Sequence, residues 1–149
     1  MRIERVVTLP ATADEAWSVL TEWERQADWM LDADRVEVVS IAREGVGVRL
    51  AVKTRLFGVP AFTEPMEVTG WDPPRRLEIR HGSVVSGTGV WSLESIDGGT
   101  RFTWSEEIEL RVPLVGDLAA RAYRPVMRIL MGRAQESLRR SIIARGPVR

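Results

Sequence analysis

A long helical pattern at the end of the chain constrains the fold more than any other sequence feature. Leu114–Ala144 covers about thirty residues whose interior is interrupted by a helix-disfavouring residue only at Pro125 and Gly132, and Gly146-Pro147 follows as a stop signal. A helix of this length spans about 45 Å, enough to cross about six or seven strands. Its apolar residues recur at steps of three and four and should face a core: Leu118, Ala122, Val126, Ile129, Leu130, Ala134, Leu138 and Ile142.

The chain before this helix predicts one strand, two short helices and then a run of strands. Arg2–Leu9 is rich in β-branched residues and ends at Pro10, which indicates a strand. Thr12 or Asp14 then caps a helix with a core-facing stripe, and Glu24–Leu31 predicts a second short helix. Further segments show strand alternation or β-branched enrichment: Arg35–Ala42, Val48–Phe57, Phe62–Trp71, Arg76–His81, Val85–Ile96 and Arg101–Val112.

The order of these elements predicts the fold class. Tight turns between successive strands imply an antiparallel sheet, so we expect an α+β fold. In it a curved, seven-stranded antiparallel sheet wraps around the long C-terminal helix, with two short helices after strand one, and residues 1–149 form a single domain. Because a large sheet curls and a helix touches it only along a line, large side chains or a pocket must fill the space between them.

Composition excludes several kinds of site. The chain has no cysteine and one histidine, His81, which excludes disulfides, cysteine-based zinc sites and two-histidine metal sites. We expect no metal ion and no cofactor, and motifs of other chemistries such as GxSxG are missing. No apolar run approaches the ~20 residues of a membrane span, and the N-terminus lacks a secretory signal. We therefore expect a cytoplasmic protein without integral membrane association.

The net charge is zero but unevenly distributed along the chain. Residues 114–149 carry eight arginines against Asp117 and Glu136, about +6, and the remaining residues carry about −6. A basic amphipathic helix can bind a membrane surface or nucleic acid. The alternative, which the apolar stripe favours, is that the helix lies on an acidic sheet and turns its arginines to water. We therefore expect no nucleic-acid partner, and the oligomeric state stays open.

Alternation places a mostly apolar set of strand side chains on one face of the sheet. The exceptions are Glu64, His81 and Glu106, which alternation also puts on that face. Buried ionisable groups need partners, so these three are the best polar candidates in a pocket, and His81 and Glu106 are the candidate catalytic groups. The alternative is a rim position next to water. A bulge between Gly87 and Gly89 would flip the face assumed for the sixth strand.

The chain has six tryptophans against one tyrosine, a bias toward large apolar rings that carry one donor. We expect Trp17 and Trp23 to pack the short helices against the sheet, Trp91 and Trp104 to form a cavity wall, and Trp29 to close its mouth. A core without a ligand is the alternative for all of them. The residues expected to bind a ligand are Trp29, Leu50, Val52, Glu64, Met66, Ile79, His81, Trp91, Trp104, Glu106, Val126 and Leu130.

Three stretches carry a resemblance to a known family: VTLPATADEAWSVLTEW, the turn WDPPRRL, and GVWSLESIDGGTRFTW before the long helix. In these stretches and in its order of elements the chain resembles the START-like (SRPBCC) superfamily, in particular its bacterial polyketide cyclase/dehydrase and lipid-transport branch. The resemblance implies a helix-grip fold whose cavity takes a hydrophobic or aromatic small molecule. Its aromatase/cyclases have a pocket tryptophan at the place of Trp29. Their following tyrosine and strand arginine are missing here, in Asp34-Arg35-Val36 and Thr63–Glu67.

Two functions remain open at this point, because a fold does not choose an activity. The first, which we favour, is the binding or transport of a small lipid- or polyketide-like molecule, for which a concave apolar pocket suffices. The second is an aromatase/cyclase or dehydratase in which His81 or Glu106 moves a proton next to a carbonyl. A scaffold that acts through protein contacts is a third, weaker hypothesis.

Overall fold

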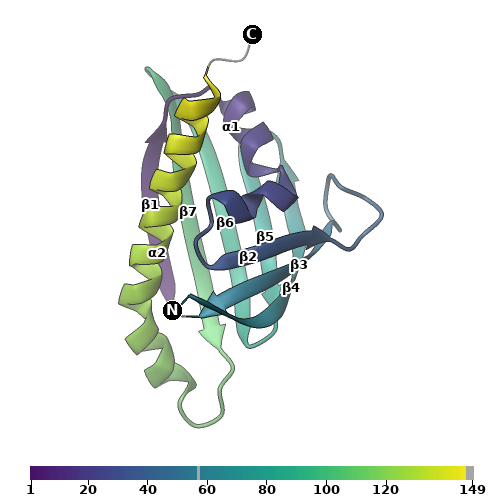
Figure 1. Ribbon diagram of the computed structural model, residues 1–149, viewed down its shortest axis with the longest axis vertical. Coiled ribbons are helices and arrows are strands. Elements are labelled where there is room, and N and C mark those ends of the chain that lie inside the picture. Colours follow the sequence, from purple (N-terminus) through teal and green to yellow (C-terminus); the bar gives the residue numbers. More distant parts are fainter. Residues whose placement is uncertain (57, 147–149) are drawn as a thin grey trace.

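The computed structural model describes residues 1–56 and 58–146 and has the predicted α+β class. An open, curved antiparallel sheet forms the body of the molecule, and a long C-terminal helix lies along one side of it (Figure 1). The predicted end of the third strand, Phe57, and the predicted helix-stop residue Pro147 lie outside the described residues. The elements are β1 (Arg2–Leu9), α1 (Ala13–Leu20), the 3₁₀ helix η1 (Trp23–Asp28), β2 (Ala33–Val38), β3 (Arg49–Leu56), β4 (Val59–Asp72), β5 (Arg76–Gly82), β6 (Val85–Ile96), β7 (Gly99–Leu110) and α2 (Gly116–Arg145).

The seven strands lie in the order β1-β7-β6-β5-β4-β3-β2, so β2 to β7 form an antiparallel meander and β1 pairs with β7. The predicted sheet is thereby confirmed, with shifted boundaries. The predicted second strand runs to Ala42, whereas β2 ends at Val38. The Ser40 hydroxyl explains the early end, because it donates to the Ala42 carbonyl and accepts from the Arg49 N–H, forming a local turn.

The two short helices pack onto the sheet as predicted. Thr12 is the N-cap of α1 and forms a capping box with Glu15, whose carboxylate accepts from the Thr12 N–H. The second helix is confirmed as the shorter η1. The ring of Trp71 on β4 lies 5.1 Å from that of Trp17 and 6.2 Å from that of Trp23, so aromatic contacts join both helices to β4.

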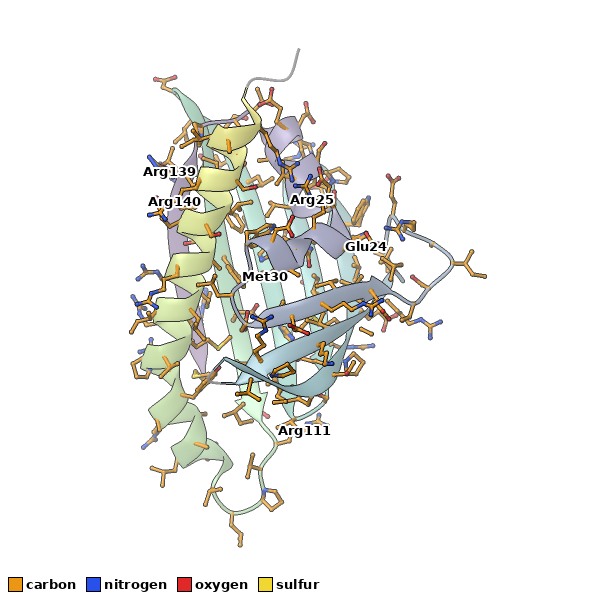
Figure 2. All side chains as sticks on the ribbon, in the orientation of Figure 1. Glu24, Arg25, Met30, Arg111, Arg139 and Arg140 are labelled. Carbon is orange, nitrogen blue, oxygen red and sulfur yellow. The ribbon has the colours of Figure 1, made fainter. Side chains whose placement is uncertain are left out.

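The helix α2 forms as predicted, but its course differs from the expectation. It packs mainly against β1 and β7 and runs beside them (Figure 1), so the idea that it crosses six or seven strands is wrong. The Gln135 amide donates to the Arg5 carbonyl, and Arg145 forms an ion pair with Glu22 at the helix end. Figure 2 shows Arg139 and Arg140 on the side of α2 that faces away from η1 and β2.

The predicted apolar stripe of α2 is correct in its second half and wrong in its first. Ala134, Leu138 and Ile142 are buried, whereas Leu118 is 70% exposed and Ile129 is 55% exposed. The first half of α2 turns a neighbouring stripe inward instead, whose members are Ala119, Ala120, Tyr123, Met127 and Met131. Both stripes have helical spacing, so the pattern alone could not tell which of them faces the sheet.

Candidate functional site

The sheet and α2 enclose a cavity of about 370 Å³. Its walls come from β3 to β7, from the segment between η1 and β2 that holds Met30 (Figure 2), and from the first half of α2. Val84 and Val112 line the cavity and are themselves exposed, which places them at its rim. The lining is predominantly apolar, as in sites for small hydrophobic molecules.

Eight of the twelve residues expected to bind a ligand line this cavity: Val52, Glu64, Met66, Ile79, His81, Trp91, Trp104 and Glu106. They come together because side chains alternate between the two faces of each strand, so these positions all fall on the concave face of the sheet. The other four do not line it. Leu50 is buried in the core, Trp29 is buried behind the cavity wall, and Val126 and Leu130 lie off the side of α2 that faces the cavity.

Trp29 forms an aromatic cluster with Trp91 and Trp104 rather than closing the mouth. Its ring lies 5.7 Å from the Trp91 ring and 6.4 Å from the Trp104 ring. The Trp29 indole nitrogen is buried and has no hydrogen-bond partner among the described residues. This cluster therefore supports the part of the cavity wall that Trp91 and Trp104 form.

The three polar exceptions form a hydrogen-bonded network across the sheet. His81 on β5 donates through Nδ1 to Glu64 Oε1 on β4 at 2.9 Å, and through Nε2 to Glu106 Oε2 on β7 at 3.0 Å. Glu106 Oε1 accepts from the Trp104 indole nitrogen at 2.8 Å. Glu64 is only 4% exposed and Glu106 only 5%, so the rim position considered for these groups does not apply.

Glycines on β6 make this network possible. β6 lies between β5 and β7, and opposite His81 and Glu106 it carries Gly87 and Gly89. A Cβ atom at Gly89 would lie 2.7 Å from Glu106 Oε1, so the carboxylate occupies the space that a side chain would fill. The β6–β7 pairing shows no register shift, so the bulge considered for this region is absent from the described pairing and the assumed face of β6 is correct.

The network holds His81 as an imidazolium. Burial disfavours the charged ring, but the hydrogen bonds and negative charges of Glu106 and Glu64 outweigh it and raise the pKa of His81 to about 10. At neutral pH both ring nitrogens therefore carry protons and donate to carboxylates. Such a ring has no lone pair, so it cannot accept a proton from a ligand while the network is intact.

Sequence reasoning missed two ionisable residues of the cavity, Asp32 and Tyr123. Burial raises the pKa of Asp32, and the charges of Glu64 and Glu106 add to this effect. Burial, followed by the charge of Asp32, raises the pKa of Tyr123 on α2. No signal marked Asp32, because it precedes β2 in a loop where alternation does not apply. Tyr123 could have been found as the one aromatic residue of α2, had the inward stripe been identified.

A single substitution on β6 tests the geometry of the network. Gly89→Ala is expected to push the Glu106 carboxylate away from His81, lower the pKa of His81 and reduce the free energy of unfolding by about 1–3 kcal/mol. NMR titration of the one imidazole and urea unfolding measure the two effects. Gly82→Ala is the matched control, because its Cβ would meet nothing closer than the Pro65 carbonyl oxygen at 3.7 Å. Equal pKa values of His81 in both variants would contradict the geometry.

Neither a metal site nor a membrane-spanning helix is found among the described residues. Within residues 1–56 and 58–146, no group of three or more histidine and acidic side chains has an arrangement that could hold a metal ion. Over the same residues, no helix combines the length and apolar character that a membrane crossing requires.

The chain is similar to known proteins over nearly its full length. Residues 1–140 match the model of a family described as polyketide cyclase/dehydrase and lipid transport. No curated protein sequence matches. A solved structure from Thermus thermophilus has a TM-score of 0.81 at 19% identity, covering 99% of this chain and 100% of that chain.

Two aromatase/cyclases are among the similar structures. The Zhui aromatase/cyclase of a Streptomyces species has a TM-score of 0.71 at 23% identity, covering 99% of each chain. The di-domain aromatase/cyclase StfQ of the steffimycin biosynthetic pathway has a TM-score of 0.77 at 14% identity. The match covers 52% of StfQ and 99% of this chain. These likenesses show a shared fold, and the family match extends through β7 and most of α2. The chain therefore belongs to the polyketide cyclase/dehydrase and lipid-transport family of the SRPBCC superfamily.

Proposed function

We propose that the protein binds a small hydrophobic or aromatic molecule, lipid- or polyketide-like, inside the cavity and works as a carrier or receptor for it. The observation that carries the proposal is a cavity of about 370 Å³ with an apolar lining, closed on one side by α2. A cavity of this size and composition gains affinity by removing apolar ligand surface from water. The family's lipid-transport members and the aromatase/cyclases of similar fold support the same class of ligand.

A binding experiment with a matched pair of variants tests this proposal. Aminoanthracene, a neutral fluorescent probe, is expected to bind the wild-type protein with increased emission. Ala119→Trp places a large ring in the cavity from α2 and is expected to weaken binding about tenfold or more, which corresponds to 1.4 kcal/mol. Ala122→Trp on the exposed side of the same helix is the control and should bind as the wild type does. Equal affinity in both variants would place the probe elsewhere and refute the proposal.

The cyclase or dehydratase alternative gains support from one observation, the raised pKa of Asp32 beside the cavity. A carboxyl with a raised pKa suits general acid–base chemistry near neutral pH. His81 is unsuited to act as the base because both its nitrogens donate to carboxylates. If the alternative is correct, Asp32→Asn abolishes turnover of a polyketide substrate while retaining its binding. A carrier shows no turnover with or without Asp32.

A further inference from the structure

The ionisable groups of the cavity have an excess of negative charge. Its acidic lining residues are Asp32, Glu64 and Glu106, and the only basic one among the described residues is His81. No lysine or arginine of residues 1–56 and 58–146 lines the cavity. Three carboxyl groups therefore face one imidazolium in the lining, and acidic groups outnumber basic ones.

The network also leaves acceptor atoms without a donor. Both oxygens of Glu106 are used, one by His81 and one by Trp104. Glu64 accepts from His81 through Oε1 alone. Its Oε2 has no partner among the hydrogen bonds of the described residues. Glu64 as a whole is 4% exposed and lines the cavity. The Asp32 carboxylate, also in the lining, accepts a hydrogen bond from a backbone N–H and has further acceptor capacity toward the cavity. Glu64 Oε2 is not among the buried atoms that lack a partner in the described residues, so it is accessible from the cavity. An accessible acceptor in an apolar cavity marks a place where a ligand's N–H or O–H fits.

We infer that the ligand of this cavity is a hydrophobic molecule with a protonated amine, which docks its N–H groups on Glu64 Oε2 and Asp32 while its apolar part fills the space lined by Val52, Ile79 and Ile108. This inference rests on the proposed function and adds the charge of the ligand to it. A cation compensates the excess negative charge in a medium of low dielectric constant, whereas a carboxylate of the same shape meets like charges. Burial is the main cause of the raised pKa of Asp32, and the negative charges of Glu64 and Glu106 add to it.

A series of ligands with one skeleton and three charges tests the inference. Naphthylmethylamine, naphthylmethanol and naphthoic acid have the same ring system and are cationic, neutral and anionic near neutral pH. Their affinities are measured by displacement of aminoanthracene from the wild-type protein. The amine is expected to bind about 100-fold more tightly than the acid, with the alcohol between them.

Variants assign this selectivity to the two carboxylates. In Glu64→Gln and in Asp32→Asn the preference for the amine over the acid should fall to a factor of about ten or less, because each variant replaces one of the carboxyl groups on which the amine docks by an uncharged amide. Asp32 is only half-buried, so its variant should fold even if Glu64→Gln does not. Glu67→Gln is the control, since Glu67 lies on the other face of β4, paired with Arg80 at 2.6 Å. This control should keep the wild-type preference.

The possible failures are distinguishable. Displacement that is independent of ligand charge, or tighter binding of the acid, overturns the inference while the cavity remains a ligand site. The same conclusion follows if the preference is unchanged in both carboxylate variants. A probe that binds equally to the wild type and to Ala119→Trp refutes the proposed function, and the inference fails with it.

Discussion

Replacing His81 by glutamine is expected to lower the free energy of unfolding by about 3–5 kcal/mol. The substitution leaves Glu64 and Glu106 buried, at 4% and 5% exposure, without the charge that compensates them. Removing one partner from a buried ionic network lowers the free energy of unfolding far more than removing one at the surface, because solvent cannot stabilise the buried charges that remain. Urea denaturation of both proteins near neutral pH measures the difference.

An exposed pair on neighbouring strands provides the control. Arg101 on β7 and Glu94 on β6 lie 2.9 Å apart with side chains 48% and 69% exposed. Glu94→Gln should therefore cost less than about 1 kcal/mol. A cost of that small size for His81→Gln as well would contradict the charged network.

A variant that replaces the whole network separates stability from function. Exchange of Glu64, His81 and Glu106 for methionine, leucine and methionine removes all three buried groups together. Replacing a buried ionic cluster by apolar residues of similar volume is often neutral or stabilising. If this variant is as stable as the wild type but has lost the preference for the amine, the network is retained for ligand recognition rather than for folding.

The three network residues could be identified from sequence, and the reason is physical. Glu64 lies on β4 between its two register shifts, and His81 and Glu106 lie on regularly paired stretches of β5 and β7. A one-residue slip there would turn apolar side chains to solvent. The concave face therefore follows from the pattern. The hydrogen bonds among these three residues could not be predicted from the pattern, because they depend on how closely β5 and β7 approach across β6. The glycines at 87 and 89 were the available signal for that approach, but they also suggested a bulge.

Apart from Leu50 on β3, the residues that sequence reasoning misplaced or missed lie where no strand pattern operates. Val126 belongs to a helix with two candidate apolar stripes, and the choice between them depends on packing against β1 and β7. Trp29 and Asp32 lie between η1 and β2, in a segment whose path is set by tertiary contacts such as the Arg55 N–H bond to the Asp32 carbonyl. A local pattern contains no information on such contacts.

The stability of the protein should fall on the alkaline side of neutrality. In the folded state the pKa of His81 is raised from 6.5 to about 10, so the folded protein binds one more proton than the unfolded chain between these values. The stabilisation from His81 is therefore fully present below pH 6.5 and is lost as the pH rises through 10, with a total of at most about 5 kcal/mol. Few other groups titrate in this range, because the chain has no cysteine, one lysine and one tyrosine.

The measurement is the free energy of unfolding from urea denaturation at several pH values, together with NMR titration of the imidazole. Because the chain has a single histidine, its ring signal needs no assignment against others. The methionine–leucine–methionine variant is the control, and its stability should be nearly flat from pH 6.5 to 10, the two pKa limits of His81. An imidazole that titrates near 6.5 in the folded wild type would contradict the network, because a ring held between two ionised carboxylates cannot release its proton so readily.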